Sequence, residues 1–398
     1  MLAFQSRLFT HLENLVVTNE AFFSKDIKHG NTIMRVYNYR LASYTDFLAP
    51  DALEARGTMF EIDQNGKPVR LACLMPQKFF NYKENPSTMN LDLSDDNIDG
   101  VMEKLDGSII STLLIDDKLV LKSKTSLDSD HAATAMQYLN QNTLFKQTLE
   151  RLTRLGYSVH MELTSPVLRI VVGYEKVSLT VLNIRDTLNG TIYYRSNLHS
   201  LPYALSEENI QLLKDNWVTD LSIEEALHKY KDDPAFIGVT NGADFVERVK
   251  DIRGIEGFVV RLKNGQLFKR KGDHYCHLHL LKENVSAPRR LFECVIAGAS
   301  DDVKVMFADD AIAIKLITDM EQKVIPIYNN IISTVEGFYE DNKHLSRKDY
   351  AIKAQSVGDD LMGLKMNVYV GRTNDYAEFA IKHNHLFGIN VHVAEVEE

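Results

Sequence analysis

Short apolar segments separated by turn residues dominate the first part of the chain, which is the pattern of antiparallel β-structure. The run from Ile109 to Ile115 is mostly apolar, and Asp116-Asp117 then turns the chain into Lys118 to Ser123. Two such runs joined by a turn predict a hairpin. The same pattern predicts strands at Glu54 to Glu61 and Val69 to Leu74 around a turn at Asp63 to Gly66, at Tyr157 to Leu163, at Val177 to Arg185, and within the tyrosine-rich stretch Thr32 to Thr45.

The dipeptide Asn264-Gly265 gives the most specific geometric prediction. Strands at 256–262 and 267–271 flank it, and Asn-Gly favours a two-residue hairpin turn. Because side chains alternate along a strand, such a turn fixes which residues share a face. The predicted pairs are Lys263 with Gln266, Val260 with Lys269, and Phe258 with Lys271, with Glu256 on the same face. This face carries either a metal ligand beside two phosphate-binding cations or a surface ladder of salt bridges.

Apolar residues at helical spacing mark three other regions. Phe4, Leu8, Leu12 and Leu15 predict an amphipathic N-terminal helix. Residues 128 to 155 predict a helix with a cap at Ser129 or Asp130, a break at 140 to 143 and a stop at Gly156. From Ala287 onward the chain reads as helical, with a stripe that is kinked or interrupted at Pro326. The stripe consists of Ile312, Leu316, Met320, Val324, Tyr328, Ile331, Val335 and Phe338, and further helices are expected at Arg347 to Leu364 and Asp375 to His383.

These patterns predict an α+β protein with two domains. An antiparallel-sheet domain is expected at residues 1–286, and an all-helical domain at 287–398. The acidic segment 196–250, with helical stretches around Glu207 to Leu213 and Ile223 to Tyr230, is interpreted as peripheral to the first domain.

Composition and charge narrow the function classes. With 44% hydrophobic and 25% charged residues, the chain has ordinary globular composition. No apolar run approaches the ~20 residues of a membrane helix, and the start lacks the pattern of a signal peptide. We therefore expect a cytoplasmic protein with no membrane partner. A monomer is a separate expectation, which these patterns do not establish. Three distant cysteines favour neither a disulfide framework nor a zinc site.

The formal net charge of −10 argues against a protein that coats nucleic acid through widespread lysine and arginine. Any polyanion must therefore be bound locally, by clusters that could equally be solvated faces. The basic clusters are Lys118, Lys122 and Lys124; Lys263, Lys269, Arg270 and Lys271; and Arg289 and Arg290.

The stretch Glu103-Lys104-Leu105-Asp106-Gly107-Ser108, which leads into an apolar run, suits a covalent nucleotidyl-transfer site. Lys104 would be the nucleophile, since a lysine amine loses its proton more readily than an arginine side chain. Asp106 would hold a ribose, a metal or the lysine, and Gly107 would let the backbone approach a nucleotide. A surface turn before a hairpin explains the same residues without any chemistry.

Other charged residues stand where a phosphate or ribose could be bound. Arg56 can make a forked contact to phosphate, or an ion pair with Glu54 or Glu61. Lys78 beside Phe79 and Phe80 suits a nucleotide edge or a core with a surface lysine. Glu162 lies in a mostly apolar strand, so its carboxylate needs a fixed partner such as a neighbouring cation or a ligand hydroxyl.

Two further groups could bind a metal ion. His277 and His279 fall on one face if their segment is a strand, but no acidic or cysteine partner recurs at ligand spacing, which favours structural histidines there and at His383 and His385. Ser300-Asp301-Asp302 could cap a helix or hold a cation, and a cap is the favoured interpretation.

In order along the chain, several motifs resemble those of the covalent nucleotidyltransferases, which comprise RNA ligases, DNA ligases and capping enzymes. The motifs are Arg56-Gly57, Lys104-Leu105-Asp106-Gly107-Ser108, Glu162, Glu256-Gly257 and Phe268-Lys269-Arg270-Lys271. Within this superfamily the chain is most similar to the RNA ligase 1 family of T-even-type bacteriophages. That likeness covers most of the chain and includes Ala42-Ser43-Tyr44, Pro50-Asp51-Ala52-Leu53-Glu54, Lys78-Phe79-Phe80-Asn81, Glu84-Asn85-Pro86, Gly298-Ala299-Ser300-Asp301-Asp302 and Ala308-Asp309-Asp310.

The resemblance implies a nucleotidyltransferase (adenylation) domain that joins RNA ends with ATP. Lys104 would attack the α-phosphate of ATP and become a lysine-adenylate, AMP would pass to the 5′-phosphate of an RNA, and a 3′-hydroxyl would displace it. The resemblance assigns nucleotide, catalytic or metal roles to Arg56, Lys78, Phe80, Glu103, Lys104, Leu105, Asp106, Gly107, Glu162, Glu256, Lys269 and Lys271, with Mg²⁺ or Mn²⁺ at Glu256 and at Asp301 and Asp302.

Family members of this type repair tRNA that has been cut in its anticodon loop. The resemblance therefore implies single-stranded RNA ends as partners, tRNA repair during phage infection, and the cytoplasm of an infected bacterium as the location. Three alternatives stay open: a DNA ligase, a capping guanylyltransferase, and a non-catalytic RNA-end-binding protein.

Overall fold

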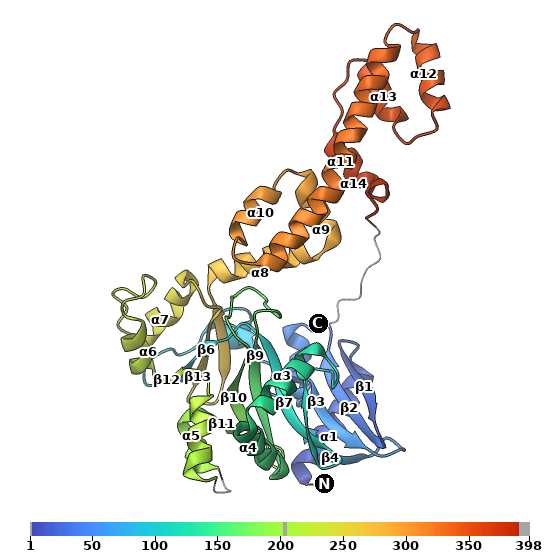
Figure 1. Cartoon of the computed structure of the whole chain (residues 1–398). Helices are drawn as coiled ribbons and strands as arrows, with labels where there is room; N and C mark the ends of the chain where they lie inside the picture. Colours follow the sequence, from blue (N-terminus) through green and yellow to red (C-terminus); the bar gives the residue numbers. More distant parts are fainter. Residues whose placement is uncertain (1, 202–204, 390–398) are drawn as a thin grey trace. The chain divides into compact units, whose positions relative to one another are not determined.

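A computed structural model describes residues 2–201 and 205–389 of the chain. The chain divides into two compact units, Met1–Cys276 and His277–Glu398. The first unit contains three sheets with helices around them, and the second is helical (Figure 1). The predicted α+β class, with antiparallel sheets followed by a helical region, is confirmed. The domain boundary predicted after residue 286 stays a prediction about which residues fold on their own.

The first sheet contains four antiparallel strands in the order β1-β2-β3-β4. The predicted N-terminal helix, α1 (Ala3–Thr18), packs Leu8, Leu12 and Leu15 into a core with Phe22 and Phe60. The strands are β1 (Phe22–His29), β2 (Thr32–Tyr39), β3 (Thr58–Ile62) and β4 (Pro68–Cys73). The predicted hairpin around residues 63–66 is therefore present as β3 and β4.

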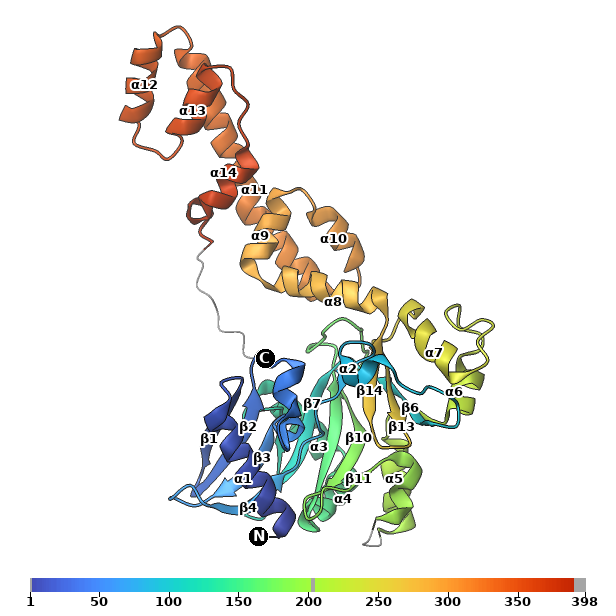
Figure 2. The ribbon, with the colours of Figure 1, turned by 180° about the vertical axis from the view of Figure 1, so that it is seen from behind.

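The second sheet has the order β11-β10-β9-β7-β8. Its strands are β7 (Ser108–Ile115), β8 (Lys118–Lys122), β9 (Tyr157–Thr164), β10 (Ser178–Asp186) and β11 (Ile192–Tyr193). The helices α3 (Asp130–Gln141) and α4 (Thr143–Arg154) pack against it, as the views from the front and from behind both show (Figures 1 and 2). The cap at Ser129 and the break at Asn142 agree with the sequence prediction.

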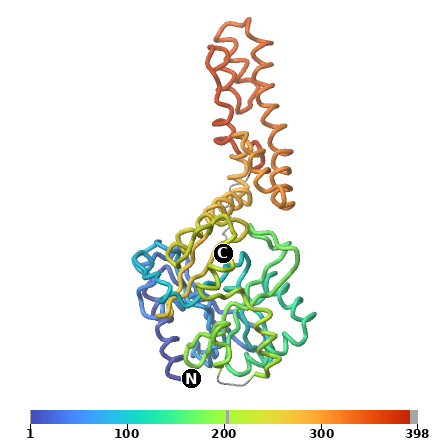
Figure 3. Tube along the Cα trace, turned by 90° about the vertical axis from the view of Figure 1, so that its left-hand side faces the viewer, coloured from blue at the N-terminus to red at the C-terminus, as the bar shows by residue number. Residues whose placement is uncertain are grey.

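The third sheet has the order β12-β6-β13-β14-β5. Its strands are β5 (Phe80–Asn81), β6 (Ile98–Lys104), β12 (Asp220–Leu221), β13 (Gly257–Leu262) and β14 (Leu267–Lys271). β5 runs parallel to β14, whereas the other neighbours are antiparallel. Figure 3 follows the same trace from the side. The remaining helices of the first unit are α2 (Pro86–Met89), α5 (Glu207–Asp215), α6 (Ile223–Tyr230) and α7 (Gly242–Arg248), with short 3-10 helices at Tyr44–Leu48, Ala52–Glu54, Arg195–Ser200 and Val249–Asp251.

A short stretch of the segment expected to be peripheral connects the second and third sheets. Trp217 forms a bridge with Val181 of β10, and Asp220 pairs with Met102 of β6. Val218 also donates its backbone N–H to the carbonyl of Val181, at 2.9 Å. The stretch is therefore a structural link between two sheets, and the interpretation of the whole segment as peripheral is wrong at this point.

The hairpin at Asn264-Gly265 forms, but its register differs by one residue from the prediction. Val260 pairs with Phe268 and Val259 pairs with Lys269, because the loop contains three residues closed by Leu262 and Gln266. Gly265 has φ +84°, which suits the left-handed position of a three-residue hairpin loop. Lys269 and Lys271 therefore share a face with Val259 and Gly257, whereas Phe258 and Val260 are buried in the core behind it.

The second unit is organised around one long helix, α11 (Ala311–Asn342). The helix continues through Pro326, so it is not interrupted there. It buries Ala313 and Ile317, whereas the predicted stripe residues Ile312 and Leu316 are 48% and 40% exposed. The other helices are α8 (Asp273–Ser286), which begins in the first unit, α9 (Pro288–Ile296), α10 (Ser300–Met306), α12 (Arg347–Ser356), α13 (Met362–Tyr369) and α14 (Tyr376–Lys382), with a 3-10 turn at Asn384–Phe387.

The histidines of α8 lie on a helix, which corrects the strand expected there. Two residues apart on a helix, His277 and His279 do not share a face. None of the helices in the described part of the chain has the length and apolar character that a bilayer crossing needs.

Candidate active site

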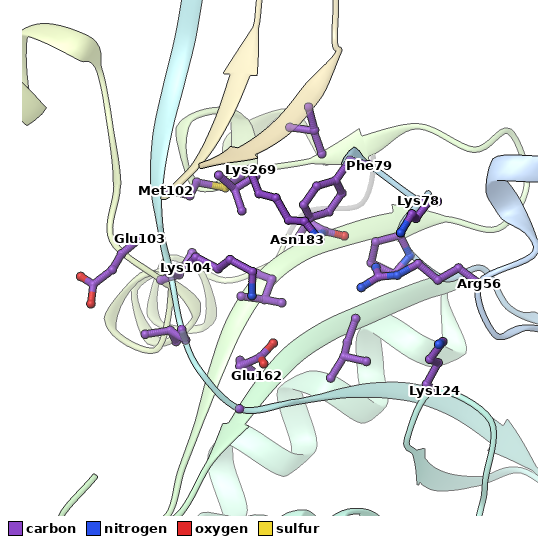
Figure 4. Close-up of a pocket in the computed structure, with 18 of the residues that line it drawn as sticks. Arg56, Lys78, Phe79, Met102, Glu103, Lys104, Lys124, Glu162, Asn183 and Lys269 are labelled. Atoms are coloured by element: carbon purple, nitrogen blue, oxygen red, sulfur yellow. The ribbon is translucent and has the colours of Figure 1, made fainter. Parts of the chain in front are cut away.

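A cavity of about 350 Å³ opens in the first unit, between the second and third sheets. Six basic side chains line it, and the acidic side chains among its lining residues are Glu103 and Glu162. Figure 4 shows Lys104 and Glu162 pointing toward one another, and Glu103 leaving β6 on the side opposite to Lys104. The six basic residues are Arg56, Lys78, Lys104, Lys124, Lys269 and Lys271. Leu105 and Gly107 line the cavity as well.

Lys104, the last residue of β6, forms an ion pair with the buried carboxylate of Glu256. Its Nζ lies 2.8 Å from Glu256 Oε2, and Lys271 Nζ lies 2.9 Å from Glu256 Oε1. Glu256 is only 3% exposed, so a polar environment must replace the water it loses. The sequence placed Glu256 on one face with Lys269 and Lys271, whereas the structure places it between Lys104 and Lys271.

Gly257 allows this arrangement because only glycine fits there. Its φ is +144°, and a Cβ would stand 2.2 Å from the carbonyl oxygen of Arg270. The backbone therefore leaves the regular strand at this residue, and the alternation predicted for Glu256 does not extend past it. Any side chain at position 257 would displace both the carboxylate and β14.

Lys269 carries the clearest sign of surplus positive charge in the cavity. Burial, together with repulsion from Lys78, Lys271, Lys104 and Arg56, lowers the pKa of its amine to about 8. Among the described residues, no carboxylate lies within 4.0 Å of Lys269. A bound polyanion would relieve this repulsion, so the cavity is electrostatically prepared for phosphate groups.

Glu162, on β9, is the carboxylate that faces Lys104 across the cavity. Burial raises the pKa of Glu162 to about 7, although the positive charge of Lys104 acts in the opposite direction. The carboxyl can therefore change protonation near neutral pH. Gly107 lies beside it, and a Cβ at Gly107 would stand 2.3 Å from the carbonyl oxygen of Leu163. The glycine thus allows a close approach to β9, which differs from the predicted approach to a nucleotide.

Asp106 does not face the cavity as the sequence suggested. Its Oδ2 accepts hydrogen bonds from the backbone N–H groups of Val171 and Val172, both at 2.7 Å, and its Oδ1 accepts one from the hydroxyl of Tyr275 at 2.6 Å. The residue is 3% exposed. Both oxygens are therefore engaged within the fold, where Asp106 holds the loop around residue 171. That Asp106 orders a ribose, a metal or the lysine stays a prediction.

A buried lysine fixes the backbone that carries two of the cavity cations. Lys122 is fully buried, and burial lowers the pKa of its amine to about 8. Its Nζ donates to the carbonyl oxygens of Gly57 and Lys124, at 3.0 and 2.8 Å. At Gly57, with φ +94°, a Cβ would lie 2.1 Å from the Lys124 carbonyl oxygen. These contacts hold Arg56 and Lys124 at a fixed separation on one wall.

Aromatic rings support the cations on this wall, but not in the way predicted. Arg56 lies over Phe79, with 5.7 Å from Cζ to the ring centroid, and Phe79 lines the cavity. Phe80, the predicted pocket residue, is instead buried in the core of the first sheet. Lys78 lies 5.4 Å from the centroid of Phe80 and 5.6 Å from that of Tyr39.

Sequence reasoning missed several residues that line the cavity. Lys124 was noted only as part of a basic cluster. Asn183, Tyr194 and Val218 were not singled out, because their segments carry no charged motif. A signal for Lys124 was present in the alternation Lys122-Ser123-Lys124, which follows a predicted hairpin strand.

The structure brings none of the predicted metal ligands of the second unit into a metal-binding cluster. Asp301 and Asp302 lie in the first turn of α10, which follows Ala299, and Ser300 is the first helical residue rather than the cap. Negative side chains in the first turn stabilise a helix without any ion. Within residues 2–201 and 205–389, no group of three or more His, Cys, Asp or Glu side chains is arranged to hold a metal.

A second hollow, of about 460 Å³, lies elsewhere in the first unit. Its charged lining includes Arg70, Arg154, Glu61, Asp116 and Asp117. Arg70 Nε lies 2.7 Å from Glu61 Oε2, and Arg154 Nη2 lies 2.7 Å from Oε1 of Glu150. Each arginine therefore already has a carboxylate partner.

Comparison with known proteins shows the family to which the chain belongs. A family model described as RNA ligase matches residues 54–281, more than half of the chain, and a model described as the C-terminal domain of T4 RNA ligase 1 matches residues 282–392. The chain belongs to the RNA ligase family. The predicted resemblance to the RNA ligase 1 family is thus confirmed, and the two matches together cover the cavity-lining residues other than Tyr39 and most of the helical unit.

Individual relatives are distant. A curated protein of Thermovibrio ammonificans, whose name assigns it to the RNA ligases, is 22% identical over 333 residues, which are 79% of this chain and 76% of that protein. A solved structure of a Naegleria gruberi RNA ligase variant with ATP and Mn is 15% identical, with a TM-score of 0.33 and coverage of 46% of this chain and 52% of the other. Another, with AMP and Mn, is 13% identical with a TM-score of 0.35, covering 51% and 57%. The chain matches only about half the length of these solved chains.

Proposed function

We propose that this RNA ligase family member joins a 5′-phosphate and a 3′-hydroxyl RNA end with ATP, through a lysine-AMP intermediate on Lys104. The observation that carries the proposal is the cavity itself, where Lys104 meets the buried carboxylate of Glu256 among five further cations. Phosphoryl transfer is catalysed largely by positioning and by neutralising phosphate charge. These residues supply both.

In the first step, the Nζ of Lys104 attacks the α-phosphate of ATP. A bond between nitrogen and phosphorus forms, the bond from the α-phosphorus to the bridging oxygen breaks, and pyrophosphate leaves with the electron pair. The attacking amine must be neutral, so its proton must be transferred away, and the ion pair with Glu256 must open for the amine to reach the phosphate. Lys269 and Lys271 of β14 would hold the departing phosphates.

A divalent cation fits the donor groups that the cavity offers. Mg²⁺ is usually bound by one or two carboxylates together with substrate phosphates and water. Glu162 lines the cavity, and Glu256 is paired with the cavity residue Lys104; these two carboxylates would hold the ion together with the nucleotide. When bound, Mg²⁺ or Mn²⁺ would neutralise charge on the phosphate oxygens.

The RNA steps follow from the same chemistry. The 5′-phosphate oxygen of an RNA would attack the lysine-bound AMP, which regenerates Lys104, and a 3′-hydroxyl would then displace AMP and seal the strand. We further propose tRNA cleaved in its anticodon loop as the substrate, in a phage-infected bacterium. This rests on the match of residues 282–392 to the C-terminal domain of T4 RNA ligase 1.

Incubation with α-labelled ATP and Mg²⁺ tests the proposal. We expect the wild-type protein to become labelled, and Lys104→Ala to abolish the label because the nucleophile is absent. Lys118→Ala, which changes an exposed lysine at the start of β8, is the matched control and should label normally. A labelled Lys104→Ala protein would reject the nucleophile, and labelling by GTP alone would favour a capping guanylyltransferase.

The RNA substrate needs a separate experiment. The wild-type protein should seal a tRNA that has been cleaved in its anticodon loop faster than a plain single strand of the same length. Equal rates for both RNAs would remove tRNA repair from the proposal but leave RNA ligation in place, whereas sealing of nicked duplex DNA alone would indicate a DNA ligase.

A further inference from the structure

Asn183 carries a side-chain amide without a partner at the wall of the cavity. Its Oδ1 is buried and has no hydrogen-bond partner, and the side chain forms no other hydrogen bond within residues 2–201 and 205–389. A buried polar atom left unpaired costs about 1–3 kcal/mol, so native proteins rarely retain one without a reason. Because neither end of the amide is bonded, rotation about χ2 can present oxygen or nitrogen to a ligand.

The backbone turns this amide toward the cavity through a β-bulge. In the pairing of β10 with β9, Val181 faces Met161 and Asn183 faces His160, so Leu182 is an extra residue. Successive side chains of a regular strand point to opposite faces. Here Leu182 and Asn183 are neighbours and both line the cavity. Bulges commonly redirect a side chain next to an active site, and this one does so.

The surroundings of Asn183 suit a flat, mostly apolar group. Met102 and Val218 line the same cavity, and both lie in the region where Trp217 and Asp220 connect the two sheets. The phosphate-binding cations come from β14 and from the loops after Glu54 and Pro76 (Figure 4). The cavity therefore offers apolar walls for a base as well as cations for its phosphates.

Tyr194 adds an aromatic wall that is held from behind. Its buried ring lies 4.0 Å from Arg261 Cζ, and Arg261 is itself buried. Arg261 Nε donates to Asp99 Oδ2 at 2.5 Å, and its Nη1 lies 3.5 Å from Asp220 Oδ1. This fixed aromatic ring, together with an unpaired amide, is the combination that recognises a nucleobase by stacking and by its edge.

We propose that Asn183 reads the edge of the adenine base of ATP, with Tyr194 as a wall of the base subsite. Oδ1 would accept a hydrogen bond from the exocyclic N6 amine, and Nδ2 would donate one to a neighbouring ring nitrogen. This inference rests on the proposed function and adds to it the residue that selects the nucleotide.

The test exchanges the hydrogen-bonding pattern at position 183 and measures nucleotide preference. Asn183→Asp provides two acceptors, which oppose a ring nitrogen of adenine but match the N1–H and N2–H donors of guanine. We expect kcat/KM for protein labelling by ATP to fall about tenfold to a hundredfold, since a two-point base contact discriminates by about 1–3 kcal/mol. The ratio of GTP to ATP labelling should rise. Asn183→Leu should lose ATP labelling without gaining GTP.

Asn38 provides a matched control. Its Oδ1 is also buried without a partner, but Asn38 does not line the cavity. Asn38→Asp should destabilise the protein and leave the ratio of GTP to ATP labelling unchanged. If that ratio is also unchanged in both Asn183 variants while wild-type labelling is normal, the inference is overturned and the proposed function stands. No labelling of the wild type by either nucleotide would overturn both.

Discussion

The two hollows of the first unit have similar sizes but opposite electrostatic designs. In the second hollow, Arg70 and Arg154 are each matched by a carboxylate. In the cavity beside Lys104, six cations meet far fewer carboxylates, and Lys269 and Arg56 have no carboxylate within 4.0 Å among the described residues. Partly buried charge without a partner is costly in the absence of a ligand. Such charge distinguishes the cavity beside Lys104 and suits the binding of a polyanion.

The largest effect is expected at Glu256, the carboxylate that pairs with two of the cavity lysines. Glu256→Ala leaves Lys104 and Lys271 without their shared partner and removes a proposed metal ligand. We expect the rate of labelling by ATP to fall by about a hundredfold or more, as for the loss of other preorganised groups at a reacting phosphate. Single-turnover labelling measures it. Glu247→Gln, at the pair with Lys83, is the control and should label normally. If the Glu256→Ala variant were labelled at the wild-type rate, this carboxylate would not be needed for the reaction, and the prediction would be wrong.

An intermediate effect is expected on stability at Glu162, because the cavity is unfavourable for charge. Its pKa is raised by burial to about 7, from an ordinary 4.5. Between these values the folded state binds more protons than the unfolded state, so the free energy of unfolding falls as the pH rises. Glu162→Gln removes this dependence.

The variant should therefore be more stable than wild type at pH 8, by on the order of 1–3 kcal/mol, and the difference should disappear below pH 4.5. Thermal unfolding midpoints of both proteins from pH 4 to pH 8 measure it. A difference that grows toward low pH would show that the carboxylate is stabilised by its surroundings, which contradicts the electrostatic contrast between the two hollows.

The smallest effect is expected at the second hollow. Arg70→Ala removes a pair with Glu61 whose side chains are 39% and 24% exposed, and pairs of this kind contribute about 0–1 kcal/mol. The loss of the hydrogen bond to the carbonyl of Leu114 adds to it. We expect a small decrease in the unfolding midpoint and unchanged labelling by ATP. A loss of labelling would give the second hollow a functional role that its paired charges do not predict.

The strands and helices were largely predictable because their signals are local. The hairpin at residues 108–122 and the helix pair at 130–154 follow from apolar spacing and turn residues within a few positions. The register of the hairpin at Asn264-Gly265 was not predictable from the sequence. Loops of two and of three residues can share that dipeptide, and they differ in the conformation of Gly265. A one-residue shift moved Phe258 into the core and left Lys269 on the cavity face.

The sequence predicted which charged residues belong to the site, but not which residues each of them contacts. Lys104 and Glu256 were both identified, yet their direct contact depends on the backbone at Gly257. The role of Asp106 depends on Val171 and Tyr275, which are far along the chain. Trp217 connects two sheets from within a segment without charged motifs, so nothing local indicates that its neighbour Val218 lines the cavity.

The contact between Gly57 and the backbone of Lys124 limits how this enzyme can change. Because no side chain fits at position 57 and a buried amine joins the two segments, Arg56 and Lys124 cannot be repositioned one at a time. The distance between Arg56 and Lys124 is therefore fixed by the backbone of both segments. An engineer who wishes to widen the entrance for a bulkier nucleotide analogue would therefore have to redesign both segments together, whereas the wall at Asn183 can be altered by one substitution.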